Sequence, residues 1–218
     1  MRTIFNFLKE LGKNNNREWY HANKSRYNKA KDIFHGFVES VIPLIAAIDK
    51  QIGSVAPKDC IFRIFRDVRF SKDKNPYKTN FGAFIAKDGK KSSNAGYYIH
   101  LEPGGSFLAG GMYMPRSPVL KAVRNEIFQN SGEFKTIISD KQFKQYFPEL
   151  YGEKLATYPR GFPKDFPDMD LLRYKSYTVL HTIDEKTAIA PDFTDYATEV
   201  FSVMYPFNKF LNACIETK

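Results

Sequence analysis

Residues 81–114 read FGAFIAKDGKKSSNAGYYIHLEPGGSFLAGGMYM, a pattern that predicts three consecutive β-strands. Its three apolar and aromatic runs are typical of strands and cover 81–87, 96–101 and 106–114. The turn signals Asp88-Gly89 and Pro103-Gly104-Gly105 separate them. Because strands joined by short loops pair in opposite directions, the stretch predicts an antiparallel sheet.

The rest of the chain carries apolar residues at helical spacing, which predicts helices on both sides of these strands. We expect helices over 3–11, 18–47, 118–128, 134–138, 143–147, 171–174 and 192–215. Two further strands are predicted over 60–65 and 177–183, and the proline-rich stretch 157–170 is predicted to be a loop. Because a proline removes a helical hydrogen bond, we expect a kink or break at Pro43 and a kink at Pro206.

These elements together predict an α+β fold, with a central antiparallel sheet packed by N-terminal and C-terminal helices. With 218 residues, of which 43% are hydrophobic, the chain is long enough to bury one core. No repeat or long linker divides it. We therefore expect a single domain over 1–218 that is helical over 1–50, sheet-rich over 58–114 and mainly helical over 118–218.

The positions of cysteine and histidine argue against two common kinds of small scaffold. Cys60 and Cys214 lie far apart, and the four histidines show no metal-ligand spacing, so we predict no disulfide scaffold, no metal and no cofactor. No apolar stretch is long enough for a signal peptide or a membrane span, so we expect a cytoplasmic protein without a membrane partner. The oligomeric state stays open.

The most unusual composition is found in residues 63–78, which read RIFRDVRFSKDKNPYK and hold six cationic side chains. The net charge of the chain is +9, and residues 58–91 supply +6 of it, with ten Lys or Arg and four Asp or Glu. Large apolar side chains interrupt the cations, which indicates charge held against a core. Such charge points to a bound anion or to an internal ion network.

Arg63, Arg66 and Arg69 recur at every third position of this run. A strand would place Arg66 on the opposite face from the other two, whereas a tight helical turn would place all three on one side. The second geometry converges three guanidinium groups, which suit phosphate or carboxylate, and Asp67 would orient one of them. The alternative is an internal salt-bridge network with the carboxylates of the N-terminal helices: Glu10, Glu18, Asp32 and Glu39.

Neighbouring residues extend this candidate binding site. Pro76 predicts a turn that would let Lys74, Tyr77 and Lys78 close a rim over the anion. Tyr77 would also stack on a base or donate its hydroxyl group. A solvated charged loop is the alternative for this segment.

A second group of candidates lies near the N-terminus. Asn15 and Glu18, three residues apart, predict a capping box at the start of the long helix. Arg17 and Trp19 would then reach the sheet and join the basic cluster. In the alternative interpretation, Trp19 is a core anchor.

Eight positions of the basic run resemble the signature of an uncharacterised bacterial family of proteins of about this length: Arg63-x-x-Arg66-Asp67-x-Arg69-Phe70-x-x-Asp73-Lys74-x-x-Tyr77. The family is domain-of-unknown-function family 2461. Asn14-Asn15-x-Arg17-Glu18-Trp19 and Gly96-Tyr97-Tyr98 extend the resemblance along the chain. It implies that the basic run is a hallmark of the family, and it implies no activity or substrate.

The strand predicted over 96–101 places Tyr98, His100 and Glu102 on one face, opposite an apolar face. This row would supply an acid or base beside the arginines, and our candidates for proton transfer are Asp67, Tyr77 and His100. In the simpler interpretation, His100 is a solvent-exposed histidine without a role.

Three hypotheses about function follow from these residues. The preferred one is a site for a small phosphate or carboxylate ligand, which includes an enzyme acting on a small phosphorylated metabolite. The second is a non-catalytic nucleic-acid-binding module whose lysines follow a phosphate backbone: Lys72, Lys78, Lys87, Lys90 and Lys91. The third is a purely structural cluster, with the functional site elsewhere. Whether the protein is an enzyme stays open.

Overall fold

The computed structural model describes residues 1–216 and contains a four-stranded antiparallel sheet with the strand order β1-β2-β3-β4. The strands are β1 (Phe81–Ile85), β2 (Gly96–Leu101), β3 (Phe107–Met112) and β4 (Tyr177–Thr182). Each strand pairs with the next one along the chain, so the sheet is a meander. Helices pack on it, which confirms the predicted α+β fold.

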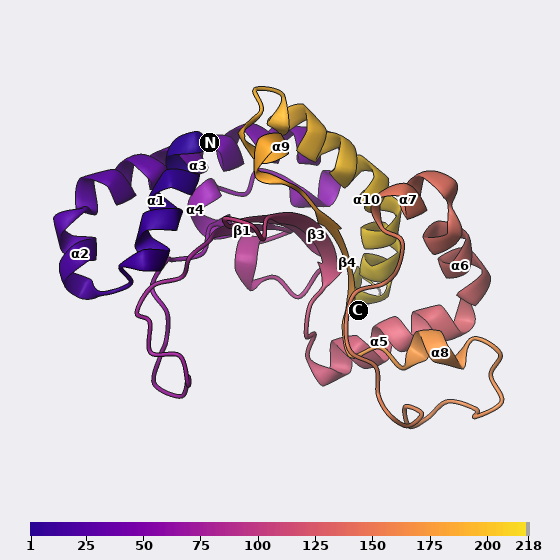
Figure 1. The fold of residues 1–218 in the computed structure, drawn as a ribbon. Coiled ribbons are helices and arrows are strands. Elements are labelled where there is room, and N and C mark those ends of the chain that lie inside the picture. Colours follow the sequence, from indigo (N-terminus) through magenta and orange to yellow (C-terminus); the bar gives the residue numbers. More distant parts are fainter. Residues whose placement is uncertain (217–218) are drawn as a thin grey trace.

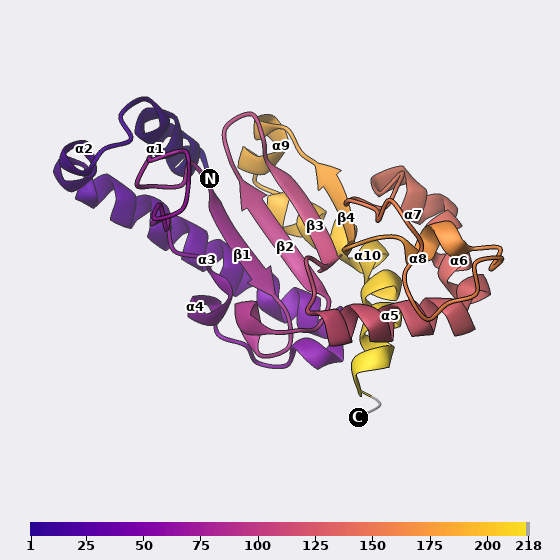
Figure 2. The ribbon, with the colours of Figure 1, turned by 90° about the horizontal axis from the view of Figure 1, so that it is seen from below.

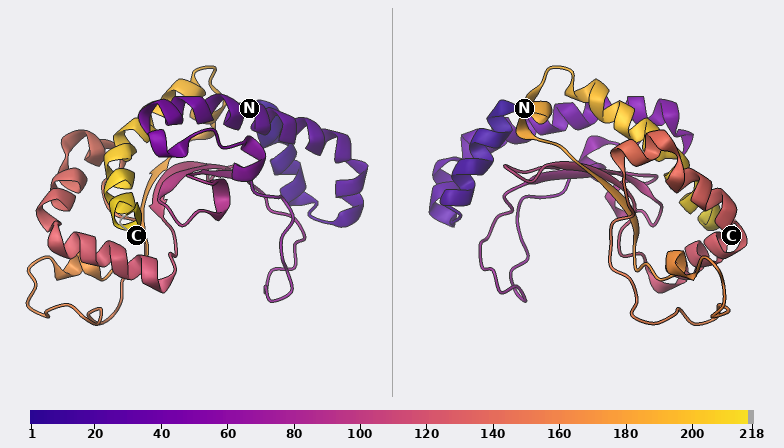
Figure 3. Two further views of the ribbon diagram at one scale, coloured as in Figure 1. Left: turned by 180° about the vertical axis from the view of Figure 1, so that it is seen from behind. Right: turned by 45° about the vertical axis from the view of Figure 1, so that its right-hand side comes forward.

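Two long helices, α3 (Lys24–Ile48) and α10 (Phe193–Glu216), lie over one face of the sheet, and α1 (Arg2–Lys13) packs on α3 beside it, as Figure 1 and Figure 3 show. Most strand residues that face them are apolar and buried, and the ring of Tyr97 lies 5.3 Å from that of Phe201 in α10. The main core therefore lies between the sheet and these helices, as the alternation along β2 predicts.

The remaining helices are short and lie mostly around the two ends of the sheet (Figure 2). They are α2 (Arg17–Ala22), α4 (Pro57–Cys60), α5 (Ser117–Gln129), α6 (Ser131–Ser139), α7 (Lys141–Tyr146), α8 (Met169–Leu172) and α9 (Glu185–Ile189), with two 3₁₀ turns, η1 (Lys50–Ile52) and η2 (Gly89–Lys91).

Figure 2 shows the opposite face of the sheet, where no helix within residues 1–216 lies across the strands. We call it the open sheet face and define it by side chains from all four strands: Phe84, Tyr98, His100, Phe107 and Leu180. All but His100 are partly exposed. A hairpin of residues 61–78 projects beside the β1 edge, and an irregular segment of residues 153–168 projects near the β4 edge (Figure 1).

Several local predictions are wrong, each because tertiary contacts outweigh a local preference. The predicted strand 60–65 is instead the end of α4 and an extended segment with isolated bridges to Ala83 and Tyr77. The long helix predicted over 18–47 is divided at Asn23 into α2 and α3.

Neither internal proline ends its helix. Pro43 lies within α3, where the neighbouring Ile42 and Ile45 are buried, and Pro206 lies within α10 next to buried Phe207. Burial of these side chains offsets the hydrogen bond that each proline removes. Helix α9 was not predicted.

Candidate functional site

The hairpin of residues 61–78, which we call the basic hairpin, extends the β1 edge of the sheet. The amide of Phe62 donates to the carbonyl of Gly82 at 2.9 Å, and the amide of Lys78 donates to the carbonyl of Ile64 at 2.8 Å. Between these two bonds a single residue, Arg63, faces the three residues 79–81. The longer side bulges, as strands often do where a side chain must be redirected.

Side chains of the N-terminal region hold the base of the hairpin. The amide group of Asn15 donates to the carbonyl of Tyr77 at 2.9 Å, and the Tyr77 amide donates back to Asn15 Oδ1 at 3.1 Å. Asn15 is therefore not the helix cap that we predicted. That role belongs to Asn16, which accepts from the amide of Trp19 at 2.8 Å.

Tyr77 lies inside this base and not on a rim over an anion, where we expected it. Its ring stacks on Tyr20 at 4.1 Å and lies 5.5 Å from Phe65, and only 3% of its surface is exposed. Because its ring is covered on both sides, Tyr77 serves as a packing residue and is not free to stack on a ligand.

Two of the three arginines bind carboxylates of the hairpin itself. Arg66 pairs with Asp73, and the guanidinium group of Arg69 donates twice to Asp67, at 2.7 and 2.9 Å. These arginines hold the pKa values of both carboxyl groups below their usual range.

Asp67 was predicted to orient one of the arginines, and it binds Arg69. The alternative interpretation named carboxylates of the N-terminal helices as partners, and that expectation is wrong for Arg66 and Arg69. Glu10, for example, pairs with Arg26 at 2.6 Å instead. The reason is geometric, since the turn of the hairpin places Asp73 next to Arg66 and so supplies a carboxylate from within the hairpin.

A different set of three cations interacts electrostatically at the base of the hairpin, namely Arg63, Arg66 and Lys78. Lys78 is half-buried, and its ammonium nitrogen lies 5.5 Å from the centre of the Phe62 ring. Burial, and then the charges of Arg63 and Arg66, lower the pKa of Lys78. Within residues 1–216, the side chains of Arg63 and Lys78 form no hydrogen bond or ion pair.

The other predicted binding residues do not belong to this set of three cations. Lys74 is exposed at the hairpin tip, where it donates to the carbonyl of Val68 at 3.2 Å. Trp19 packs against Phe7, with ring centres 6.0 Å apart, so it anchors α2 on α1. Arg17 is exposed, and its side chain forms no hydrogen bond or ion pair with the described part of the chain.

The row predicted along β2 forms a hydrogen-bonded group that we call the His100 cluster: Tyr98, His100 and Glu102, with Thr79 and Asn80. His100 Nε2 lies 3.1 Å from Glu102 Oε2, and His100 Nδ1 lies 3.1 Å from the Tyr98 hydroxyl. The Thr79 hydroxyl donates to Glu102 at 2.6 Å. The amide nitrogen of Asn80 lies 2.9 Å from His100 Nδ1.

His100 is buried, with 9% of its surface exposed, so it is not the solvent-exposed histidine of the simpler interpretation. Burial is the largest cause that lowers its pKa, the charge of Lys78 lowers it further, and Glu102 opposes both. Burial, then the charge of Glu102, raises the pKa of Tyr98 to about 12. Because a carboxylate only accepts hydrogen bonds, we assign the proton of the neutral ring to Nε2, which leaves Nδ1 to accept from Tyr98.

Sequence reasoning missed Phe62, Thr79 and Asn80, which join the basic hairpin to the His100 cluster. The Phe62 ring lies between Lys78 and Tyr98, at 6.1 Å from the latter. Extending the alternation of the first strand upstream from Gly82 would have placed Asn80 on the open sheet face. The bulge that brings Thr79 to Glu102 has no such signal in the sequence.

The family described as conserved hypothetical protein (DUF2461) matches residues 3–210. The chain belongs to this family. The resemblance predicted from the basic run is thereby confirmed, and the printed description assigns no activity. No match was found among curated proteins or among solved structures.

The positions that carried the resemblance to DUF2461 have distinct structural tasks in this chain. Asn15 and Tyr77 join the N-terminal region to the hairpin, Arg66 and Asp73 close its turn, and Tyr98 belongs to the His100 cluster. In this chain these positions therefore fix the hairpin beside the open sheet face.

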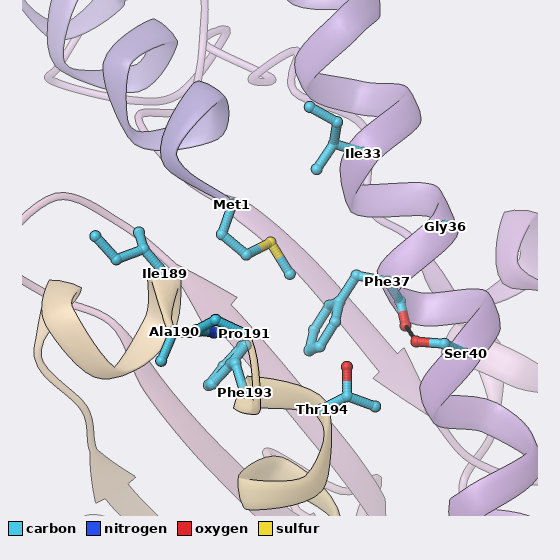
Figure 4. A pocket seen from close by; sticks show the side chains of 10 residues that line it. All are labelled: Met1, Ile33, Gly36, Phe37, Ser40, Ile189, Ala190, Pro191, Phe193 and Thr194. Atoms are coloured by element: carbon cyan, nitrogen blue, oxygen red, sulfur yellow. Dashed lines mark hydrogen bonds between the residues drawn. The ribbon is translucent and has the colours of Figure 1, made fainter.

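Two hollows lie elsewhere on the surface. One of about 360 Å³ lies on the helical side, between α3 and the segment from α9 to α10, with Phe37 and Phe193 in its wall (Figure 4). The other, of about 330 Å³, is lined by residues that include Lys13, Thr79 and Glu102, so it opens beside the His100 cluster.

Within residues 1–216 there is no group of three histidine, cysteine or acidic side chains placed to hold a metal ion. Cys60 is buried, and burial raises the pKa of its thiol to about 11, which disfavours the reactive thiolate. No helix in the described residues is long and apolar enough to cross a membrane.

Proposed function

We propose that this protein binds a small anion, a phosphate or carboxylate group, between the basic hairpin and the His100 cluster. One observation carries the proposal: the charges of Arg63 and Arg66 act on the half-buried ammonium group of Lys78, and within residues 1–216 only Arg66 of these three cations pairs with a carboxylate, that of Asp73.

The physical argument is one of charge balance. A cation that is partly removed from water loses hydration, and neighbouring cations add repulsion. An anion bound among Arg63, Arg66 and Lys78 would offset both costs, and guanidinium forks suit the oxygens of phosphate or carboxylate. The three cations are therefore more favourably placed when an anion is bound among them than when the site is empty.

The same site supports an enzyme acting on a small phosphorylated or carboxylated metabolite. Of the three predicted candidates for proton transfer, Asp67 is paired with Arg69, and Tyr77 is buried in the hairpin base. His100 remains, with a neutral ring that links the Tyr98 hydroxyl to Glu102. This arrangement can move a proton between a ligand and the cluster through Tyr98.

The two other hypotheses receive less support. Tyr77, the residue expected to stack on a base in a nucleic-acid module, is buried. A purely structural network accounts for Arg66 and Arg69, which have carboxylate partners in the hairpin, but within residues 1–216 it leaves Lys78 without one.

Thermal melting with inorganic phosphate tests the proposal on the wild type and on Lys78→Met. The control is Lys91→Met, which removes the same charge from an exposed position. Phosphate should raise the melting temperature of the wild type and the control, because it binds the folded state, but not that of Lys78→Met. Without phosphate, Lys78→Met should melt no lower than the wild type, since repulsion is relieved. Equal stabilisation of all three proteins by phosphate would contradict the proposal.

A further inference from the structure

Two glycines on the open sheet face leave room for aromatic rings to lie across the neighbouring strand. A Cβ atom on Gly82 of β1 would lie 2.7 Å from the hydroxyl oxygen of Tyr98 and 3.2 Å from its Cζ. A Cβ atom on Gly96 of β2 would lie 2.9 Å from Cζ of Phe84. The rings of Tyr98 and Phe84, which are cross-strand partners, thus occupy the space that a side chain would fill.

Two further rings extend this surface, and we call the four together the aromatic row: Phe62, Phe84, Tyr98 and Phe107. The centre of the Tyr98 ring lies 6.1 Å from that of Phe62 and 5.7 Å from that of Phe107. Phe62 is 37% exposed, and the other three are partly exposed. Aromatic surface left in water on an uncovered face is typical of a ligand site.

Cationic charge lies at one end of the aromatic row, whereas the carboxylate of Glu102 binds His100, whose ring stacks on Phe107. Lys78 lies against Phe62 at the β1 edge, with Arg63 and Arg66 close by. At the other end, the open-face residues of β3 and β4 carry no charge: Phe107, Ala109, Leu180 and Thr182. A ligand that fits this face therefore has an anionic group at one end and a planar, weakly polar part at the other.

We infer that the ligand is a nucleoside monophosphate, with its phosphate at Lys78 and Arg63 and its base on the aromatic row. The phosphate half of this inference rests on the proposed function. Bases stack on aromatic side chains whatever their sequence, because every base has a π-face. A single nucleotide fits better than a single strand, since a strand would need cations along the whole row.

Titration calorimetry with four probes tests the inference on the wild-type protein: inorganic phosphate, ribose 5-phosphate, adenosine and adenosine monophosphate. The nucleotide should bind at least about tenfold more tightly than ribose 5-phosphate, because stacking adds to the phosphate contacts. Phe62→Leu should remove most of this gain, measured as the ratio of the affinities for adenosine monophosphate and ribose 5-phosphate. The matched control is Phe70→Leu at the hairpin tip, where the ring is 95% exposed, and it should bind like the wild type.

The outcomes separate this inference from the proposed function. Equal affinity for adenosine monophosphate and ribose 5-phosphate would contradict a nucleotide ligand but would remain consistent with the anion site. Unchanged affinity of Lys78→Met for phosphate overturns the anion site itself. A short oligonucleotide that binds far more tightly than the mononucleotide, with steep salt dependence, would show that a single strand is the occupant and would overturn the mononucleotide.

Discussion

His100 shows how much the meaning of one side chain depends on its surroundings. It lies on the face of β2 that no described helix covers, yet it is buried, because Phe107 stacks on its ring at 4.4 Å and Asn80 reaches it from the bulge. One ring nitrogen of His100 is hydrogen-bonded to Glu102 and the other to Tyr98. A histidine so held is kept neutral and oriented, which suits proton transfer.

The lowered pKa of His100 has a consequence for stability. The unfolded chain takes up its proton first as the pH falls below about 6.5, so the folded state loses stability from there down through the folded-state pKa. Above that window the contribution is fully present. We expect His100→Gln to lose less stability than the wild type between about pH 7.5 and about pH 5, measured by urea unfolding.

His181, whose pKa burial also lowers, supplies the comparison for this experiment. His181→Gln should flatten the pH profile through a separate contribution, so the double variant should be flatter than either single one. A His100→Gln profile that matches the wild type would contradict a neutral, buried His100.

At the level of elements, the basic hairpin depends on a contact outside itself. Its tip carries Arg69 and Phe70 into solvent, and its base is held by Asn15 and by the stack of Tyr20 on Tyr77. The base therefore determines where Lys78 and Arg63 lie, and docking to the N-terminal region positions the candidate anion site.

Asn15→Ala should loosen the hairpin, because it removes both hydrogen bonds to the backbone of Tyr77. We expect a loss of about 1–3 kcal/mol in the free energy of unfolding. Faster hydrogen exchange is expected at the amides of Arg66 and Lys78, which bond across the hairpin.

Asn16→Ala is the matched control, since it removes the cap of α2 and costs about 1 kcal/mol. It should leave exchange in the hairpin slow. If the two variants expose the hairpin amides equally, Asn15 does not hold the hairpin.

At the scale of the whole molecule, the candidate site exists because helices cover one face of the sheet and leave the other face open. Helix α10 approaches β3 so closely that a Cβ atom on Gly110 would lie 2.0 Å from Sδ of Met204 and 2.7 Å from the carbonyl oxygen of Gly96. This close packing concentrates the apolar core on one face, and the opposite face is left for polar and aromatic groups.

Gly110→Ala should therefore destabilise the whole fold, because the new methyl group meets backbone as well as the flexible Met204. Overpacking of this kind costs about 1–3 kcal/mol or more in the free energy of unfolding, measured by urea denaturation.

Gly36→Ala in α3 makes the same chemical change where no atom lies within 4 Å of the new Cβ. It should raise stability by about 0.5–1 kcal/mol through helix propensity. A neutral Gly110→Ala would show that α10 packs less closely on the sheet than described.

The elements of this protein follow from local periodicity. The strands predicted over 81–87, 96–101 and 106–114 are found at 81–85, 96–101 and 107–112. They and the apolar and polar faces of β2 were predictable because alternation is a property of neighbouring residues. The first and last helices were predicted for the same reason. The predicted strand at 60–65 failed because Pro57 starts a helical turn there, and the rest of that segment is extended with only isolated bridges.

The sequence by itself thus determined the α+β meander, the family and the location of the basic run. Only the tertiary structure decided which group each cation meets: Asp73 for Arg66, Asp67 for Arg69, and the ring of Phe62 for Lys78. In the tertiary structure Tyr77 is buried against Tyr20, and Asn15 binds the backbone of Tyr77 instead of capping a helix. Asn15 and Tyr77 are 62 residues apart. Periodicity acts over a few residues, whereas contacts at such separations depend on how the whole chain packs.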